Sequence, residues 1–196
     1  SVISSNCSFG QIMKFINTIS HLVILTIAFS ATARADAVSK QTFEAKIGYC
    51  QDCHGPSGQG YRGYFPMPRL AGQTTEYFEN QLRAFVERRR EAHLAIIMSK
   101  VHGLSPALQT ALAAHFSELN PPPFGRAAKQ LAGTGKDIYE QGIPDDNVPA
   151  CQVCHGPEAK GTGPNPRLAG QLYPYTVKEL ENWDKERGQG ANPDTS

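Results

Sequence analysis

The feature that most constrains this chain is a five-residue pattern that occurs twice: two cysteines separated by two residues and followed at once by histidine. The two occurrences are Cys50-Gln51-Asp52-Cys53-His54 and Cys151-Gln152-Val153-Cys154-His155. Residues three apart on a helix share a face, so both thiols of one pattern can reach the two vinyl groups along one haem edge. The next residue then points its imidazole at the iron. The pattern predicts two covalent c-type haems (haem c), with His54 and His155 as proximal iron ligands.

Other uses of these four cysteines were weighed. An even set of cysteines in an exported protein commonly forms disulfides. A Cys-x-x-Cys redox pair requires a βαβ context with strands, which this sequence lacks. A zinc cluster would need adjacent Cys and His ligands to share one small tetrahedral ion, for which they are awkwardly placed. Haem attachment is therefore the preferred interpretation.

A longer repeat surrounds the two patterns. The block Pro68-Arg69-Leu70-Ala71-Gly72-Gln73 recurs as Pro166-Arg167-Leu168-Ala169-Gly170-Gln171, an offset of 98 (166 − 68). The residues after the block keep this offset: Tyr77 matches Tyr175, Leu82 matches Leu180, Phe85 matches Trp183 and Arg89 matches Arg187. Between pattern and block, the second copy is three residues shorter. The chain is therefore a duplicated unit.

The expected organisation is two small domains in tandem. Residues 121–123 are three prolines, which fix the backbone and should form a stiff linker. We call residues 36–120 the first copy and residues 124–196 the second copy. Units of this size struggle to bury a sufficient apolar core, and a haem in each would supply it. The second copy is expected to be incomplete at its C-terminus, because the offset carries Met98 to Ser196, the last residue.

Residues 1–35 are expected to hold upstream residues and a signal peptide. They contain no Asp or Glu, and a basic start at Met13 leads through a short apolar run to a small-residue site at Ala35. This order is typical of a secretory signal cleaved after Ala35. The apolar run is too short to cross a bilayer, so cleavage is preferred to an uncleaved anchor and no stable membrane insertion is expected. The formal charge of +1 gives no large field for binding nucleic acid.

The secondary structure is expected to be helical. Thr74 can cap a helix with an apolar stripe, and Ser105-Pro106 starts another. The stripes consist of Tyr77, Phe78, Leu82, Phe85 and Val86 in the first helix and Leu108, Leu112, Phe116 and Leu119 in the second. Gly- and Pro-rich loops follow each histidine, and no run alternates like a strand.

Together, the Cys-x-x-Cys-His patterns and the Pro-Arg-Leu-Ala-Gly-Gln blocks resemble the diheme class I cytochromes c, especially cytochrome c4 and its relatives. The resemblance covers roughly residues 43–190. It implies an all-α fold of two tandem small class I cytochrome c-type domains, each wrapped around one covalently bound haem. It also implies a periplasmic carrier of single electrons between redox proteins, respiratory or dehydrogenase partners, and no catalysis of its own.

The resemblance assigns further residues to the haem surroundings. Pro68 and Pro166 would accept a hydrogen bond from the proximal imidazole through their carbonyls, fixing its orientation. Arg69 and Arg167 would pair with haem propionates. The alternatives are that the prolines only shape their loops and that the arginines form exposed salt bridges.

The sixth iron ligand differs between the copies. Met98 is expected to ligate the first haem, with Met67, His93 and His102 as alternatives. No methionine follows Cys154. Either the protein continues beyond this sequence and supplies a ligand, or the second iron is open or takes a histidine from another chain.

Two rival functions follow from an open second haem. One is a haem-dependent oxidoreductase of the peroxidase or thiosulfate-oxidising type. The other is a cytochrome subunit of a dehydrogenase or respiratory assembly, or a polymer that conducts electrons. The run Arg88-Arg89-Arg90 is expected to be a solvated helix face, with a docking patch for an acidic redox partner as the alternative.

Overall fold

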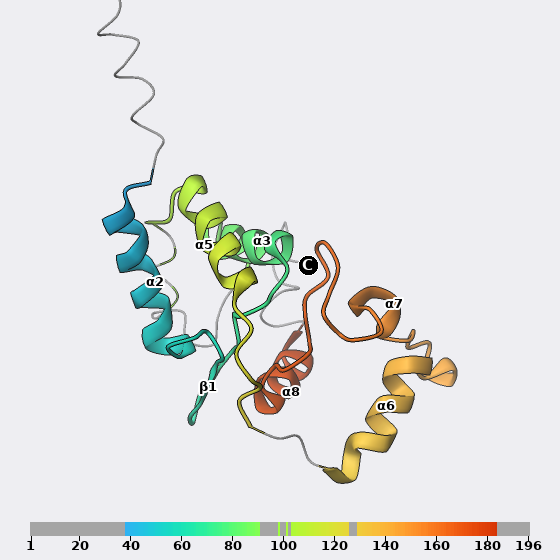
Figure 1. Cartoon of the computed structure of the whole chain (residues 1–196). Helices are drawn as coiled ribbons and strands as arrows, with labels where there is room; N and C mark the ends of the chain where they lie inside the picture. Colours follow the sequence, from blue (N-terminus) through green and yellow to red (C-terminus); the bar gives the residue numbers. More distant parts are fainter. Residues whose placement is uncertain (1–37, 91–97, 99–100, 102, 126–128, 184–196) are drawn as a thin grey trace, which may run out of the picture. The chain divides into compact units, whose positions relative to one another are not determined.

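The computed structural model describes residues 38–90, 98, 101, 103–125 and 129–183. The signal peptide expected in residues 1–35, with Met13 and Ala35, lies outside these ranges. The helices are α2 (Lys40–His54), α3 (Thr75–Val86), α5 (Pro106–Glu118), α6 (Ala132–Gln141), α7 (Gln152–His155) and α8 (Tyr173–Glu181), with 3-10 helices η2 (Lys129–Leu131) and η3 (Pro144–Asp146) (Figure 1). The described residues from Ser39 onward belong to one compact unit.

Both predicted helix starts are confirmed. The Thr74 hydroxyl accepts a hydrogen bond from the backbone N–H of Tyr77 at 3.3 Å, and α3 begins at the next residue. The Ser105 hydroxyl accepts from Leu108 at 3.4 Å, and α5 begins at Pro106. Each cap satisfies an amide that has no partner inside its helix.

The apolar core of the first copy lies between α3 and α5, which pack together (Figure 1). The rings of Phe78 and Phe116 stack there with centroids 5.5 Å apart, and Leu112 is fully buried beside them. Helix α2, which carries the first Cys-x-x-Cys-His pattern, also packs on α5. Its Phe43 ring meets His115 edge to face at 5.9 Å. The core therefore holds the helix that bears the first pattern.

The described residues contain one short pair of strands that no sequence pattern predicted. Strands β1 (Tyr61–Arg62) and β2 (Pro66–Met67) pair antiparallel within the loop after His54. Two residues per strand are too few to show the alternating pattern from which strands are predicted. The second copy has a single bridge between Thr162 and Asn165 at this place. The three-residue difference between the copies therefore falls in this hairpin.

The second copy has few buried residues among those the structure describes. None of the residues of α6, α7 or α8 is buried. Leu172, just before α8, is 2% exposed. It reaches the first copy, where a Cβ at Gly60 would lie 3.1 Å from its Cδ1. Residues 121–123 form neither helix nor strand, and the domain limits stay a prediction.

Candidate haem-binding sites

The first Cys-x-x-Cys-His pattern occupies the C-terminal end of α2. Cys50 and Cys53 are half-buried and unpaired, and His54 is the last residue of the helix. Gly55 follows with φ of +84°, and a side chain there would collide with Gln59. This left-handed residue turns the chain so that the loop folds back over the histidine.

A backbone carbonyl orients the His54 ring. The Nδ1 of His54 lies 2.8 Å from the carbonyl oxygen of Pro68, to which it donates in the neutral tautomer that ligates metals through Nε2. The residue as a whole is 8% exposed. Burial lowers the pKa of His54, and the Pro68 hydrogen bond opposes that shift. The imidazole is therefore held neutral with its Nε2 available for iron.

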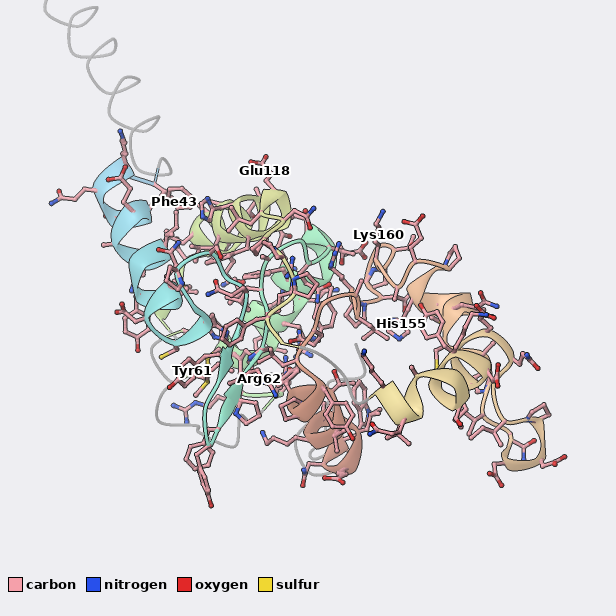
Figure 2. All side chains as sticks on the ribbon, turned by 60° about the horizontal axis from the view of Figure 1, so that its bottom comes forward. Phe43, Tyr61, Arg62, Glu118, His155 and Lys160 are labelled. Atoms are coloured by element: carbon pink, nitrogen blue, oxygen red, sulfur yellow. The ribbon has the colours of Figure 1, made fainter. Side chains whose placement is uncertain are left out.

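The second pattern repeats this arrangement. His155 ends α7, and its Nδ1 lies 2.8 Å from the carbonyl oxygen of Pro166. Gly156 follows with φ of +78°, as Gly55 does in the first copy. Figure 2 labels His155 on its ribbon. The hydrogen bond that each proline carbonyl was expected to accept from the imidazole is thus present in both copies.

The two sites fit haem better than the rival groups. The four cysteines are free, so neither pattern is a disulfide. Burial raises the pKa of Cys50 to about 11, so the free thiol is neutral. Within the part of the chain that the structure describes, no three His, Cys, Asp or Glu side chains gather closely enough to hold a metal ion. Two thiols beside an oriented imidazole are the donor set that covalent haem needs.

Two of the four candidates for the sixth iron ligand lie within the residues that the structure describes. Met98 is half-buried. His93 and His102 lie outside the described residues. Met67 sits in β2 directly before Pro68. The assignment of Met98 therefore stays a prediction.

Two arginines meet near the contact between the copies. Arg69 is 4% exposed, and its guanidinium donates to the carbonyls of Ala71 at 2.9 Å and Pro122 at 3.5 Å. Arg167 donates likewise to Ala169 at 2.9 Å. Burial, and then the charge of Arg167, lowers the pKa of Arg69. The exposed salt bridge considered for Arg69 is therefore wrong, because the residue is buried and its guanidinium donates to neutral carbonyls.

The glutamines that end the two repeated blocks join the copies, a role that the sequence analysis did not assign. Gln171 accepts from the Arg69 N–H at 2.8 Å and donates to the Arg69 carbonyl at 3.1 Å. Gln73 does the same to Arg167, at 2.6 and 3.3 Å. Each carboxamide thus accepts from the N–H and donates to the carbonyl of one residue in the other copy, as the backbone of a neighbouring strand would. The signal in the sequence was the repetition of the glutamine itself.

The Arg88-Arg89-Arg90 run is not a uniform solvated face. Arg88 is exposed, and Arg89 pairs with Glu87 at 2.7 Å. Arg90 is buried at 9% exposure and pairs with Glu179 of the second copy at 3.0 Å. The expectation of a solvated face is wrong for Arg90, because its charge finds a partner 89 residues away, which local helix periodicity cannot reveal.

A search of the described helices for a membrane span finds none of sufficient length and apolar character.

Comparisons with known proteins identify similar chains. A cytochrome c-552 of Acidithiobacillus ferridurans is 38% identical over 162 residues, covering 81% of this chain and 69% of the relative. A cytochrome c4 of Thiocapsa roseopersicina is 37% identical over 148 residues, 73% of each chain. A thiosulfate dehydrogenase electron acceptor of Thiomonas intermedia is 36% identical over 149 residues, 74% of this chain and 66% of the relative. No protein-family model matches the chain.

Solved structures agree with these relatives. The cytochrome c4 structure of Acidithiobacillus ferrooxidans has a TM-score of 0.60 at 36% identity, covering 70% of this chain and 81% of that one. The reduced recombinant cytochrome c4 of Pseudomonas stutzeri has a TM-score of 0.64 at 27% identity, covering 76% and 82%. The expected all-α fold of tandem cytochrome c domains is confirmed by these neighbours.

Proposed function

Because the chain belongs to the cytochrome c4 family of diheme class I cytochromes c, it carries electrons on two covalently bound haem c groups, and we propose that it does so in the periplasm between dehydrogenase and respiratory partners. The observation that carries the proposal is the duplicated site. Both copies contain two free thiols and an imidazole whose Nδ1 lies 2.8 Å from a proline carbonyl.

We assign the residues of each site by what they can do. Cys50, Cys53 and their counterparts Cys151 and Cys154 form the thioethers. The imidazoles of His54 and His155 bind iron through Nε2, while Pro68 and Pro166 hold the opposite ring nitrogen. The bound haem supplies an iron that gains and loses one electron. Met98 closes the first iron, which suits a carrier and excludes small ligands.

Arg69 and Arg167 are proposed to receive haem propionates. Arg69 is buried, and the guanidinium groups of both arginines donate to neutral carbonyls. A buried cation with only neutral partners is costly, and a carboxylate would offset that cost. In an Arg69→Gln variant, the first haem loses a nearby positive charge, so the oxidised form is favoured and its reduction potential falls. Potentiometric titration measures the shift, with the exposed Arg62→Gln as control. An unchanged potential contradicts the assignment.

The dehydrogenase partner is supported by the names of relatives. The chain is 36% identical to a protein named a thiosulfate dehydrogenase electron acceptor. That name describes a protein that receives electrons from an enzyme, so we propose that this chain is the acceptor and not the enzyme. Cyanide or imidazole should bind the ferric protein slowly and weakly if both irons are closed. Fast, tight binding at one haem would favour the oxidoreductase alternative.

The haem content is tested by the intact mass of protein from a host competent in cytochrome maturation. The native protein should carry two haems and no alkylatable thiol in either pattern. Cys154→Ser or Cys53→Ser should weaken attachment of one haem and leave the other in place, and Ser57→Ala serves as a control of similar size outside the patterns. A colourless product whose thiols react freely contradicts the proposal. Fractionation of cells then checks the periplasmic location.

A further inference from the structure

Arg90 lies where equivalent positions of the two copies meet. Its Nη1 donates to Oε1 of Gln81 in the first copy, and its Nη2 donates to Oε2 of Glu179 in the second copy at 3.0 Å. Gln81 and Glu179 occupy the same position of the repeat, since 179 − 81 is 98. One guanidinium therefore bridges two side chains that the duplication made equivalent.

Further contacts fix the guanidinium in place. The same Nη2 donates to the hydroxyl of Tyr175 at 3.0 Å, and the guanidinium carbon lies 4.8 Å from the centre of the Phe85 ring. Tyr175 is in α8 and Phe85 is in α3. The planar group is thus held by one ring and by polar groups of both copies, a geometry that a lysine could not reproduce.

Burial separates this ion pair from the exposed ones. The side chains of Arg90 and Glu179 are 8% and 11% exposed. By contrast, the pairs Lys40–Glu44, Arg89–Glu87, Lys136–Glu140 and Lys160–Glu158 lie within one copy and are more exposed. Exposed pairs contribute little to stability, whereas removing one partner of a buried pair leaves a charge without compensation. The contact between the copies is therefore sensitive to Arg90.

The asymmetry of the bridge has a physical reason. The position equivalent to Arg90 is Gly188 in the sequence (90 + 98), so the repeat does not provide a second arginine at this position. Likewise one copy supplies a carboxylate, and the other supplies the neutral amide of the same shape. At a place shared by both copies, a second arginine would put like charges together, which is unfavourable at short range.

We propose that Arg90 is a positioning residue that holds the two haem-bearing copies in the arrangement needed for electron transfer between their haems. The inference rests on the two-haem carrier function. It goes beyond that function by naming one side chain on which electron transfer between the two haems depends. Arg90 acts through Gln81, Glu179 and Tyr175.

The main test compares neighbouring arginines in the holoprotein. A sub-stoichiometric pulse of reductant reduces one haem, and the absorbance then relaxes as the electron redistributes to the other. In Arg90→Gln this internal rate should fall by about tenfold. The reason is that the two copies would be in the native arrangement for only about one tenth of the time, and the observed rate is proportional to that fraction. The haem count and absorption spectrum should not change. Arg89→Gln, whose partner Glu87 is in the same copy, should keep the native rate.

A charge exchange tests whether Arg90 truly bridges equivalent positions. Glu179→Gln alone should slow the internal rate and lower the unfolding temperature. The double variant Gln81→Glu with Glu179→Gln moves the carboxylate to the other copy, where Arg90 already reaches. It should recover most of both losses. This pair of variants also decides the matter if Arg90→Gln does not fold with two haems.

Two results overturn the inference: a native internal rate in Arg90→Gln, or a double variant no better than Glu179→Gln alone. A native protein without two haems would instead refute the carrier function, so the two failures are distinguishable.

Discussion

The loop that follows the histidine has the same backbone structure in both copies, but the apolar core around it differs. Of the buried apolar residues that the structure describes, Leu172 alone belongs to the second copy. Yet the backbone around each histidine is nearly identical. The first copy has Gly60 N to His54 O at 2.8 Å, Leu70 N to Gly58 O at 2.9 Å and Ala71 N to Gly58 O at 3.0 Å. The second has Gly161 N to His155 O at 2.9 Å, Leu168 N to Ala159 O at 2.8 Å and Ala169 N to Ala159 O at 2.8 Å.

The orientation of each histidine is therefore set by its own loop. The proline carbonyl reaches Nδ1 at 2.8 Å whether or not helices such as α3 and α5 pack behind the loop. Left-handed glycines and short backbone hydrogen bonds suffice to close it. The surrounding core therefore contributes stability, and the loop contributes the ligand orientation.

The largest expected difference between the copies is in how much the free energy of unfolding falls when a large apolar side chain is replaced by alanine. Phe116→Ala removes a fully buried ring that stacks on Phe78, and should lower the free energy of unfolding by about 3–5 kcal/mol. Leu180→Ala, at 71% exposure in the second copy, should change it by about 0.5 kcal/mol or less. Denaturant unfolding of the holoprotein measures both. A similar loss for Leu180 would show that haem or residues outside the described ranges cover it.

The next effect concerns a loop position filled differently in the two copies. Gly58 has φ of +65°, and an added Cβ would lie 3.1 Å from the Phe116 ring. Gly58→Ala should therefore lower the free energy of unfolding by about 2 kcal/mol. Of this loss, about 1–2 kcal/mol comes from placing a residue with a Cβ in a left-handed backbone conformation. Gly48→Ala is the control, because Gly48 lies inside α2 with open space around it and should gain about 0.5–1 kcal/mol. Equal effects of the two changes, by thermal unfolding, would contradict this account.

A smaller effect should be the same in both copies. Pro68→Ala and Pro166→Ala keep the carbonyl that accepts a hydrogen bond from the imidazole. They also increase the conformational entropy of the unfolded chain, because alanine restricts the backbone less than proline does. Each should lower stability by about 0.4–1 kcal/mol. The visible circular dichroism of the haems should stay native. A loss much larger in one copy than in the other would show that the loops are not equivalent.

The smallest effect should come from relieving strain in the second copy. Ala159, the counterpart of Gly58, has φ of +53°, which costs a residue with a side chain. Ala159→Gly removes this strain but increases the freedom of the unfolded chain, so stability should rise by about 0.5 kcal/mol. Differential scanning calorimetry can resolve the change. A clear loss of stability would show that the Ala159 methyl makes contacts that matter.

Local signals in the sequence predicted the local structure well. The caps at Thr74 and Ser105 and the left-handed loops act within a few residues, so the sequence reveals them directly. The hydrogen bonds from His54 and His155 were expected from a resemblance and are present. The ligand role of Met98 stays a prediction.

Contacts between distant residues escaped prediction. Gln73 and Gln171 bind the backbone of the opposite copy, 94 and 102 residues away. Arg90 looked like part of a basic surface, and its burial depends on α8, which supplies Glu179 and Tyr175. Such pairing follows from how the copies dock, and no periodicity within a single helix encodes it. The duplication was a usable clue, because equivalent residues are the natural members of a contact with approximate two-fold symmetry.

The reciprocal glutamine contact also limits assembly. Each carboxamide donates to and accepts from the opposite backbone, and Gly72 and Gly170, with φ of +72° and +75°, leave room for the facing arginines. An isologous patch used up in this way is closed, unlike a head-to-tail patch, which can recruit another molecule indefinitely. Any filament of these chains must therefore grow from some other part of the surface, because this patch ends with the pair.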